Sequence, residues 1–233
     1  MLKRLTRNLV DYDRADSFGS KMRARRVDPL VRLIERVYDE RGSVSIIDVG
    51  GTRRYWKILP AGLFERCDVQ VTIVNLPGAP NTGGSTERFT HIEGDGCDLA
   101  EHAENGFDIA HSNSVIEHVG DWDRVESFAA EMQRVARYYY CQTPHFWFPV
   151  EPHCMTPIFH WLPKATRVSM VQRFALGNWS RQTDVREAVR TVESARLLDR
   201  RMFTTLFGTD ATVRTERFCA WPKSMTAIGS SST

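Results

Sequence analysis

VSIIDVGG, residues 44–51, decides the fold of this chain. Its six leading residues are mostly apolar and β-branched, which is typical of a buried strand, and the two glycines predict a tight turn behind it. Apolar residues at helical spacing over 27–38 predict a helix that ends near Gly42. The chain therefore leads from a helix directly into the first strand of a sheet.

Strand-like segments recur downstream of this first strand. They lie at residues 69–74, 88–93, 107–111 and 138–143, with a helix predicted around 122–136. Strands separated by helices or helix-length connections favour a mostly parallel sheet with helices on both faces. Further segments follow residue 143: two helices at 164–176 and 184–206, and a closing β-hairpin at 211–218 and 223–228. The sequence predicts an α/β, doubly wound, seven-stranded sheet.

Length and composition set the class of protein. The 233 residues suit one α/β domain, with an N-terminal helical segment at 1–42 and the main domain at 43–233. A net charge of +2 and a hydrophobic content of 42% argue against a nucleic-acid binder and against a disordered chain. Nine Lys or Arg fall within residues 1–32, and they favour a solvated helical face over a contact with phosphate or a membrane surface.

The cysteines and the N-terminus indicate the compartment. The five cysteines are an odd number, widely spaced, and form no Cys-x-x-Cys pair. No secretory signal and no apolar stretch of membrane-spanning length occurs in the sequence. We expect a reduced, cytoplasmic protein.

Polar residues and glycines gather where the predicted strands end. They are Asp48, Gly50, Gly51 and Thr52 after the first strand, Asn75 after the second, Asp95 and Gly96 after the third, and His111 and Ser112 at the end of the fourth. Open parallel sheets bind ligands at the carboxyl ends of their strands. These residues are therefore predicted to form one binding rim.

The glycine turn distinguishes between two ligand classes. A dinucleotide site requires Gly-x-Gly-x-x-Gly, whereas bulky residues follow Gly51 from Arg53 onward. The carboxylate of Asp48 would repel a pyrophosphate but attract a ligand that carries ammonium and sulfonium groups. A nicotinamide oxidoreductase is therefore disfavoured, and S-adenosylmethionine fits.

Five segments carry a resemblance to a known family. They are IIDVGG (46–51), VTIVNLPG (71–78), IEGDGCDL (92–99), FDIAHSNSVIEHV (107–119) and RVARYYYCQTP (134–144). They resemble class I S-adenosylmethionine-dependent methyltransferases, in the branch of quinone-biosynthesis and other small-molecule enzymes. The resemblance implies a Rossmann-like sheet whose closing hairpin contains an antiparallel strand.

The resemblance also implies a role for each residue of the rim. Asp48, Gly50, Gly51 and Thr52 would line the methionine end of the cofactor, Asn75 the ribose, Asp95 and Gly96 the adenine, and His111 and Ser112 the floor. Asn75 stands where the family usually has an acidic residue, so its hydrogen bond to the ribose would lack the strength that a charge adds.

Residues 144–163 are unusually rich in proline, histidine and aromatic side chains. Because they follow the fifth strand, we expect them to form an acceptor wall near the methyl group; a rigid linker and a membrane-touching loop are the alternatives. Hydroxyl acceptors need a base, and the candidates are His153, His145 and His118. The spacing of His145, His153, Cys154 and His160 fits no standard zinc pattern, so no metal site is predicted.

The predicted function is O-methylation of a small molecule, a sugar or a lipid-linked glycan. The Asn-Pro-Pro-Tyr type of motif used on exocyclic base amines is missing after the fourth strand, which argues against nucleic acid as the acceptor. The alternative is a non-catalytic S-adenosylmethionine-binding or regulatory protein. The sequence leaves the acceptor, the base and the oligomeric state open.

Overall fold

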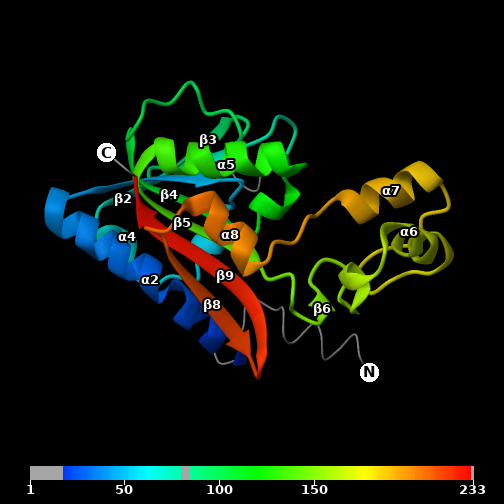
Figure 1. Cartoon of the computed structure of the whole chain (residues 1–233). Helices are drawn as coiled ribbons and strands as arrows, with labels where there is room; N and C mark the ends of the chain where they lie inside the picture. Colours follow the sequence, from blue (N-terminus) through cyan, green and yellow to red (C-terminus); the bar gives the residue numbers. More distant parts are fainter. Residues whose placement is uncertain (1–17, 80–83, 232–233) are drawn as a thin grey trace.

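The computed structural model describes residues 18–79 and 84–231. Its centre is a seven-stranded sheet in the order β3-β2-β1-β4-β5-β9-β8 (Figure 1). The strands are β1 (Val44–Val49), β2 (Val69–Asn75), β3 (Phe89–Glu93), β4 (Phe107–Asn113), β5 (Ala136–Pro144), β8 (Thr212–Phe218) and β9 (Trp221–Ser230). β1 to β5 pair in parallel, whereas β9 is antiparallel to both of its neighbours. The predicted fold class is confirmed.

Helices connect these strands and continue beyond them. They are α2 (Phe18–Arg41), α3 (Arg53–Trp56), α4 (Leu63–Arg66), η1 (Ile116–His118), α5 (Trp122–Arg134), η2 (Phe159–Trp161), α6 (Lys164–Arg173), α7 (Val185–Glu193) and α8 (Arg200–Phe207). The helix predicted over 184–206 is two helices, because the Asp199 carboxylate caps a new helix by accepting a hydrogen bond from the Met202 amide. That part of the prediction is wrong, and the break leaves residues 194–199 as an irregular connection.

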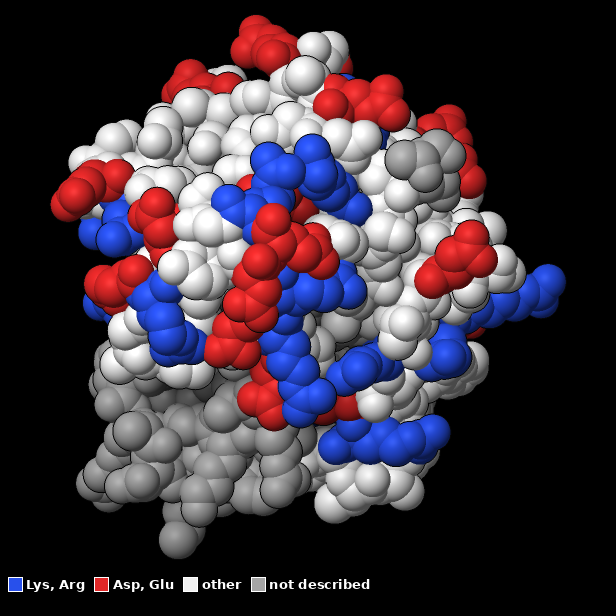
Figure 2. All heavy atoms as spheres, turned by 90° about the vertical axis from the view of Figure 1, so that its left-hand side faces the viewer, with Lys and Arg blue, Asp and Glu red and all other residues white. Residues whose placement is uncertain are grey.

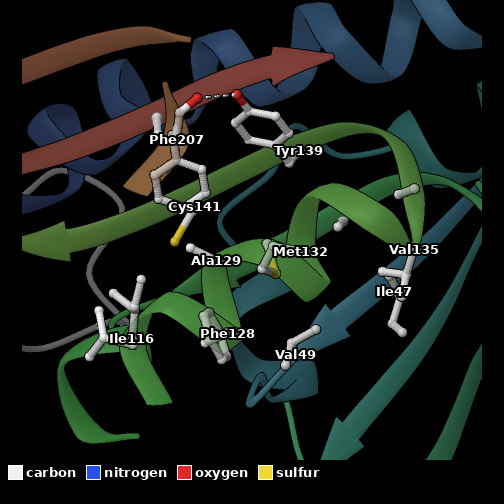
Figure 3. Packing of buried hydrophobic residues seen from close by; sticks show 14 of the residues in the cluster. Ile47, Val49, Ile116, Phe128, Ala129, Met132, Val135, Tyr139, Cys141 and Phe207 are labelled. Carbon is white, nitrogen blue, oxygen red and sulfur yellow. Dashed lines mark hydrogen bonds between the residues drawn. The ribbon is translucent and has the colours of Figure 1, made fainter. Parts of the chain in front are cut away.

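Each face of the sheet has its own apolar core. On one face, α5 and α8 pack on the central strands through residues such as Phe128, Met132 and Phe207 (Figure 3). On the other face, α2 contributes Leu30 and Ile34 to a second buried cluster. Because both faces are covered, β1 and β4 are buried along almost their whole length.

A small lobe follows β5 and stands apart from the sheet in Figure 1. It contains the short hairpin of β6 (Val150–Glu151) and β7 (Thr156–Pro157), together with η2, α6 and α7. Its own cluster of buried apolar side chains consists of Cys154, Phe159, Val171, Ala188 and Val192. Residues 144–163 are thus the entry into this lobe, which has α6 and α7 as its outer part.

Charged side chains of both signs intermingle on the face shown in Figure 2. Among the described residues, exposed ion pairs join Arg66 to Glu35 and Arg36 to Glu40. Most of the basic residues counted in 1–32 lie outside the residues whose side chains are described. Of the helices in the described part of the chain, none combines the length and the apolar character needed to cross a membrane.

Candidate functional site

The turn after β1 brings two loops into contact. Gly50 has a φ of +73°, and a Cβ added to it would lie 2.5 Å from a methyl carbon of Val115. Val115 belongs to the loop that follows β4, the strand paired with β1. A glycine is needed at position 50 both for the left-handed backbone and for this close approach.

Asp48 is fully buried at the end of β1, and both of its carboxylate oxygens are hydrogen-bonded. Oδ1 lies 2.6 Å from Nδ1 of His111, and Oδ2 accepts a hydrogen bond of 2.8 Å from Nε1 of Trp56. A Cβ at Gly51 would lie 1.9 Å from the same Oδ2. The second glycine of the turn therefore makes room for the buried carboxylate.

The position of the proton on His111 follows from this contact. A carboxylate only accepts hydrogen bonds, so the proton of the neutral ring lies on Nδ1. Nε2 is then a lone-pair nitrogen, and it is buried with no hydrogen-bond partner among the described residues. The ring lies between aromatic neighbours, 4.5 Å from the ring centre of Tyr55 and 5.6 Å from that of Tyr140. The Asp48 and His111 pair is therefore a rigid polar element with one unused atom.

A cavity of about 240 Å³ opens at these strand ends. Five of the nine residues predicted for the cofactor line it: Asp48, Gly50, Gly51, Thr52 and His111. Arg54, Tyr55 and Asn113 also line it, and the sequence analysis did not propose them. Arg54 and Tyr55 lie three and four residues after Gly51, so their closeness to the glycine turn could have pointed to them in the sequence.

Two of the other four predicted residues brace this region without lining the cavity. Ser112 is fully buried, and its hydroxyl donates to the carbonyl oxygen of Val49 at 3.0 Å. The Asn75 amide donates to the carbonyl oxygen of Gly51 at 3.1 Å. Both contacts hold the end of β1 against a neighbouring strand.

Asp95 and Gly96 also lie outside this cavity. Both carboxylate oxygens of Asp95 accept hydrogen bonds of 2.8 Å from Arg124, and the Cys97 amide donates to one of them at 3.0 Å. Burial alone would raise the pKa of Asp95, but these hydrogen bonds lower it overall. A Cβ at Gly96 would lie 2.8 Å from the Phe128 ring, so this glycine is required for packing. Arg124 was missed because its position on α5 gives no motif.

Two of the three histidines predicted as bases, His118 and His153, lie close to each other. One ligand-type atom from each of Glu117, His118 and His153 lies within 4.8 Å of the other two. The rings of His118 and His153 are 4.6 Å apart and nearly perpendicular. His145 is not part of this group: it is buried, and its Nδ1 accepts a hydrogen bond from the Trp147 amide.

Glu117 is the buried member of this group, and the sequence analysis did not propose it. Glu117 is 1% exposed, and its Oε2 accepts a hydrogen bond of 2.9 Å from the Thr143 hydroxyl. Oε1 is buried and has no partner among the described residues. Burial raises the pKa of Glu117 to about 7. The site therefore contains a carboxyl group that is costly to ionise without a further partner.

A second cavity, of about 270 Å³, lies in the lobe beside this group. Its wall includes Glu151, whose carboxylate accepts a hydrogen bond from Nδ1 of His153. Aromatic side chains line it as well, among them Phe146 and Trp179, together with the cation Arg167. Nε of Arg167 is buried without a partner among the described residues.

The five aromatic residues of 144–163 do not form one exposed surface. Trp147 is exposed, Phe159 is buried, and Phe146, Phe148 and Trp161 are half-buried. Trp147 and Ile158 are the large apolar side chains of residues 144–163 that are exposed.

The sequence matches no family model and no curated protein. Solved structures, however, resemble it. The carbon methyltransferase CurJ is 9% identical, with a TM-score of 0.56 over 100% of this chain and 59% of CurJ. An O-methyltransferase family protein of Burkholderia thailandensis is 14% identical, with a TM-score of 0.48 over 100% of this chain and 69% of that one. Phosphoethanolamine N-methyltransferase 2 of Haemonchus contortus, in complex with S-adenosyl-L-methionine, is 11% identical, with a TM-score of 0.49 over 85% of this chain and 52% of that one.

This chain thus spans between about half and two thirds of the length of those three proteins. At such low identity, the likeness to CurJ establishes the fold and nothing finer. The strand order, the antiparallel β9 and this likeness agree. The protein has the seven-stranded fold of a class I methyltransferase.

Proposed function

We propose that the protein is an S-adenosylmethionine-dependent methyltransferase that methylates an oxygen of a small molecule, a sugar or a lipid-linked glycan. The observation that carries this proposal is the cavity at the carboxyl ends of β1 and β4, which is bounded by the glycine turn and by the buried pair of Asp48 and His111. This is where an open parallel sheet binds its ligand.

The residues of the cavity suit the amino-acid end of the cofactor. Its lining contains one acidic and one basic residue, Asp48 and Arg54, which complement an ammonium and a carboxylate group. Nε2 of His111 offers an unused hydrogen-bonding atom. When bound, S-adenosylmethionine supplies a methyl carbon activated by the positive sulfur.

The adenosine end would lie toward Asn75 and Asp95. The Asn75 side chain uses its amide nitrogen on Gly51, so its oxygen is the atom that would accept from a ribose hydroxyl. Asp95 is already paired with Arg124, but a carboxylate offers about four lone-pair positions and can accept a further hydrogen bond. Arg124 would then hold Asp95 in position for the adenine amino group.

The acceptor would lie between this cavity and the lobe. The loop that contacts Gly50 through Val115 leads within two residues to Glu117. The group of Glu117, His118 and His153 would therefore lie close to the acceptor oxygen. The neighbouring cavity of about 270 Å³ is large enough for a ring compound, which the aromatic side chains would contact. The motif resemblance to quinone-biosynthesis and other small-molecule enzymes supports the same class of acceptor.

Binding of S-adenosylhomocysteine tests the cofactor. Isothermal titration should show saturable binding, and Asn75→Ala should weaken it by about tenfold or less, because one neutral hydrogen bond contributes about 0.5–1.5 kcal/mol. NADH serves as the control ligand and should give no heat. The absence of both heat and thermal stabilisation at millimolar S-adenosylhomocysteine would contradict the proposal, and binding of NADH instead would favour an oxidoreductase.

Transfer of the methyl group distinguishes an enzyme from a protein that only binds the cofactor. Incubation with methyl-labelled cofactor and cell extract, followed by fractionation, should label the small-molecule, polysaccharide or lipid fraction. Binding of S-adenosylhomocysteine without label in any fraction would favour the non-catalytic alternative.

A further inference from the structure

Hydrogen bonds show that Nδ1 carries a proton in both histidines beside Glu117. Nδ1 of His118 lies 2.6 Å from the carbonyl oxygen of Ser194, and Nδ1 of His153 lies 2.6 Å from Oε1 of Glu151. Both partners are acceptors, so each Nδ1 carries a proton and each neutral ring keeps a lone pair on Nε2. A metal-ligating histidine is held in this way, with its other nitrogen donating to a carboxylate or a carbonyl.

Glu151 is built to hold His153. It is 4% exposed, and besides the ring nitrogen it accepts hydrogen bonds from the backbone amides of His153 and Cys154. The irregular connection between α7 and α8 holds His118 in the same manner, because it supplies the Ser194 carbonyl.

Glu117 supplies the third atom. Oε1 is buried with no partner among the described residues, while Oε2 is held by Thr143. An unpaired carboxylate in such a place is costly, and a positive partner removes that cost. One ligand-type atom of each of the three side chains lies within 4.8 Å of the other two.

The ligand set indicates the class of ion. One carboxylate and two imidazoles suit first-row transition metals better than magnesium or calcium, which prefer oxygen ligands. Bonds of about 2.0–2.2 Å at tetrahedral angles put ligand atoms roughly 3.4 Å apart, so the side chains would have to rotate inward by roughly 1 Å to close on a metal. Three protein ligands leave coordination positions open for a substrate oxygen.

We propose that Glu117, His118 and His153 form a binding site for a divalent transition-metal ion, whose open position holds the oxygen of the methyl acceptor. The first half of this inference stands on the three side chains and their partners alone. The second half rests on the proposed methyl transfer and on the contact between Gly50 and Val115, which joins the cofactor cavity to this loop. The two histidines are then ligands that orient the acceptor through the metal. The metal would lower the pKa of the acceptor hydroxyl, so that its proton would leave to solvent. The oxygen would then form its bond to the methyl carbon as the bond from that carbon to sulfur breaks and S-adenosylhomocysteine leaves.

Cobalt titration of the full chain, after treatment with a chelator, tests the site without any methyl donor. The wild-type protein should bind one Co²⁺ and develop visible absorption bands, and Zn²⁺ should displace it. Glu117→Gln keeps the size of the side chain and an acceptor for Thr143, so it should fold and lose at least about 100-fold in affinity. His118→Ala and His153→Ala should lose as much. Glu151→Gln, which removes only the carboxylate behind His153, should weaken binding by about 10- to 100-fold.

His102→Ala is the matched control. His102 lies outside the group and contacts the Phe107 ring, so its replacement should leave the cobalt affinity unchanged. The proposal is overturned if wild type shows no stoichiometric binding, or if Glu117→Gln and His102→Ala bind Co²⁺ as tightly as wild type.

A second measurement separates this inference from the proposed function. Removing the metal should leave S-adenosylhomocysteine binding within about twofold, while transfer of the labelled methyl group should fall by about 100-fold and recover with Zn²⁺ or Co²⁺. Full transfer by the metal-free protein would overturn the role of the metal and leave the methyltransferase proposal intact. Cobalt binding without S-adenosylhomocysteine binding would contradict the methyltransferase proposal and the acceptor role, and retain the metal site.

Discussion

Asp48→Ala is expected to abolish S-adenosylhomocysteine binding and to lower the free energy of unfolding by about 2–6 kcal/mol. Removing the carboxylate leaves two buried donors, Nδ1 of His111 and Nε1 of Trp56, without an acceptor, and each costs about 1–3 kcal/mol. The imidazole ring would also lose the contact that fixes its orientation in the cavity wall. Urea unfolding followed by tryptophan fluorescence measures the stability, and isothermal titration measures the affinity.

A second buried aspartate separates the loss of binding from the loss of stability. Asp108 is 5% exposed and is bonded to Ser45 and Arg41 at the opposite end of β4 from His111. Asp108→Ala should destabilise the fold and leave the affinity of the folded protein nearly unchanged. Asp48→Asn should fall between wild type and Asp48→Ala, because its amide keeps one acceptor oxygen. If Asp48→Ala binds like wild type, the cofactor is wrongly placed.

Gly50→Ala is the second change for which we expect a large effect. The new methyl group would lie 2.5 Å from a methyl carbon of Val115 and would require a left-handed backbone conformation. The conformation costs about 1–2 kcal/mol, and overpacking of this kind costs typically about 1–3 kcal/mol more. Because the glycine turn bounds the cavity, S-adenosylhomocysteine binding should weaken by at least about tenfold.

Gly42→Ala is the control for the backbone contribution. Gly42 has a φ of +77° with nothing within 4 Å of an added Cβ. Gly42→Ala should therefore show the conformational cost without a steric clash. The double variant Gly50→Ala with Val115→Ala should recover part of the stability, since the nearest remaining side-chain atom of residue 115 would lie 3.2 Å away. Equal stability of the two single variants, or no recovery in the double variant, would contradict the contact between the loops.

The strands were predictable because their signal is local. A buried parallel strand is a short apolar run closed by turn residues, as in VSIIDVGG, and β1, β2, β3, β4, β5 and the closing hairpin all lie where the sequence places them. The split between α7 and α8 was not predictable from periodicity. Apolar spacing continues through 184–206, whereas in the structure a new helix begins after Asp199, which caps it.

The polar rim was predictable in part. Parallel strands bring their carboxyl ends together, so residues at those ends, such as Asp48 and His111, had to be neighbours once the strand order was known. Which of them face a cavity depended on side-chain contacts. The Ser112 hydroxyl donates a hydrogen bond to the Val49 carbonyl, and the Asp95 carboxylate is held by Arg124 of α5.

The sequence by itself determined the α/β class, the positions of the strands and the glycine turn, because these follow from interactions between residues close together in the chain. Only the tertiary structure brought His153 from the lobe to His118 and Glu117, and only it supplied the Ser194 carbonyl and the Glu151 carboxylate that fix the two rings. The physical reason is that a binding site depends on distance and on desolvation. Glu117 stands in the sequence as an ordinary charged residue, and its burial with an unpaired oxygen arises only when β4, β5 and the lobe pack around it.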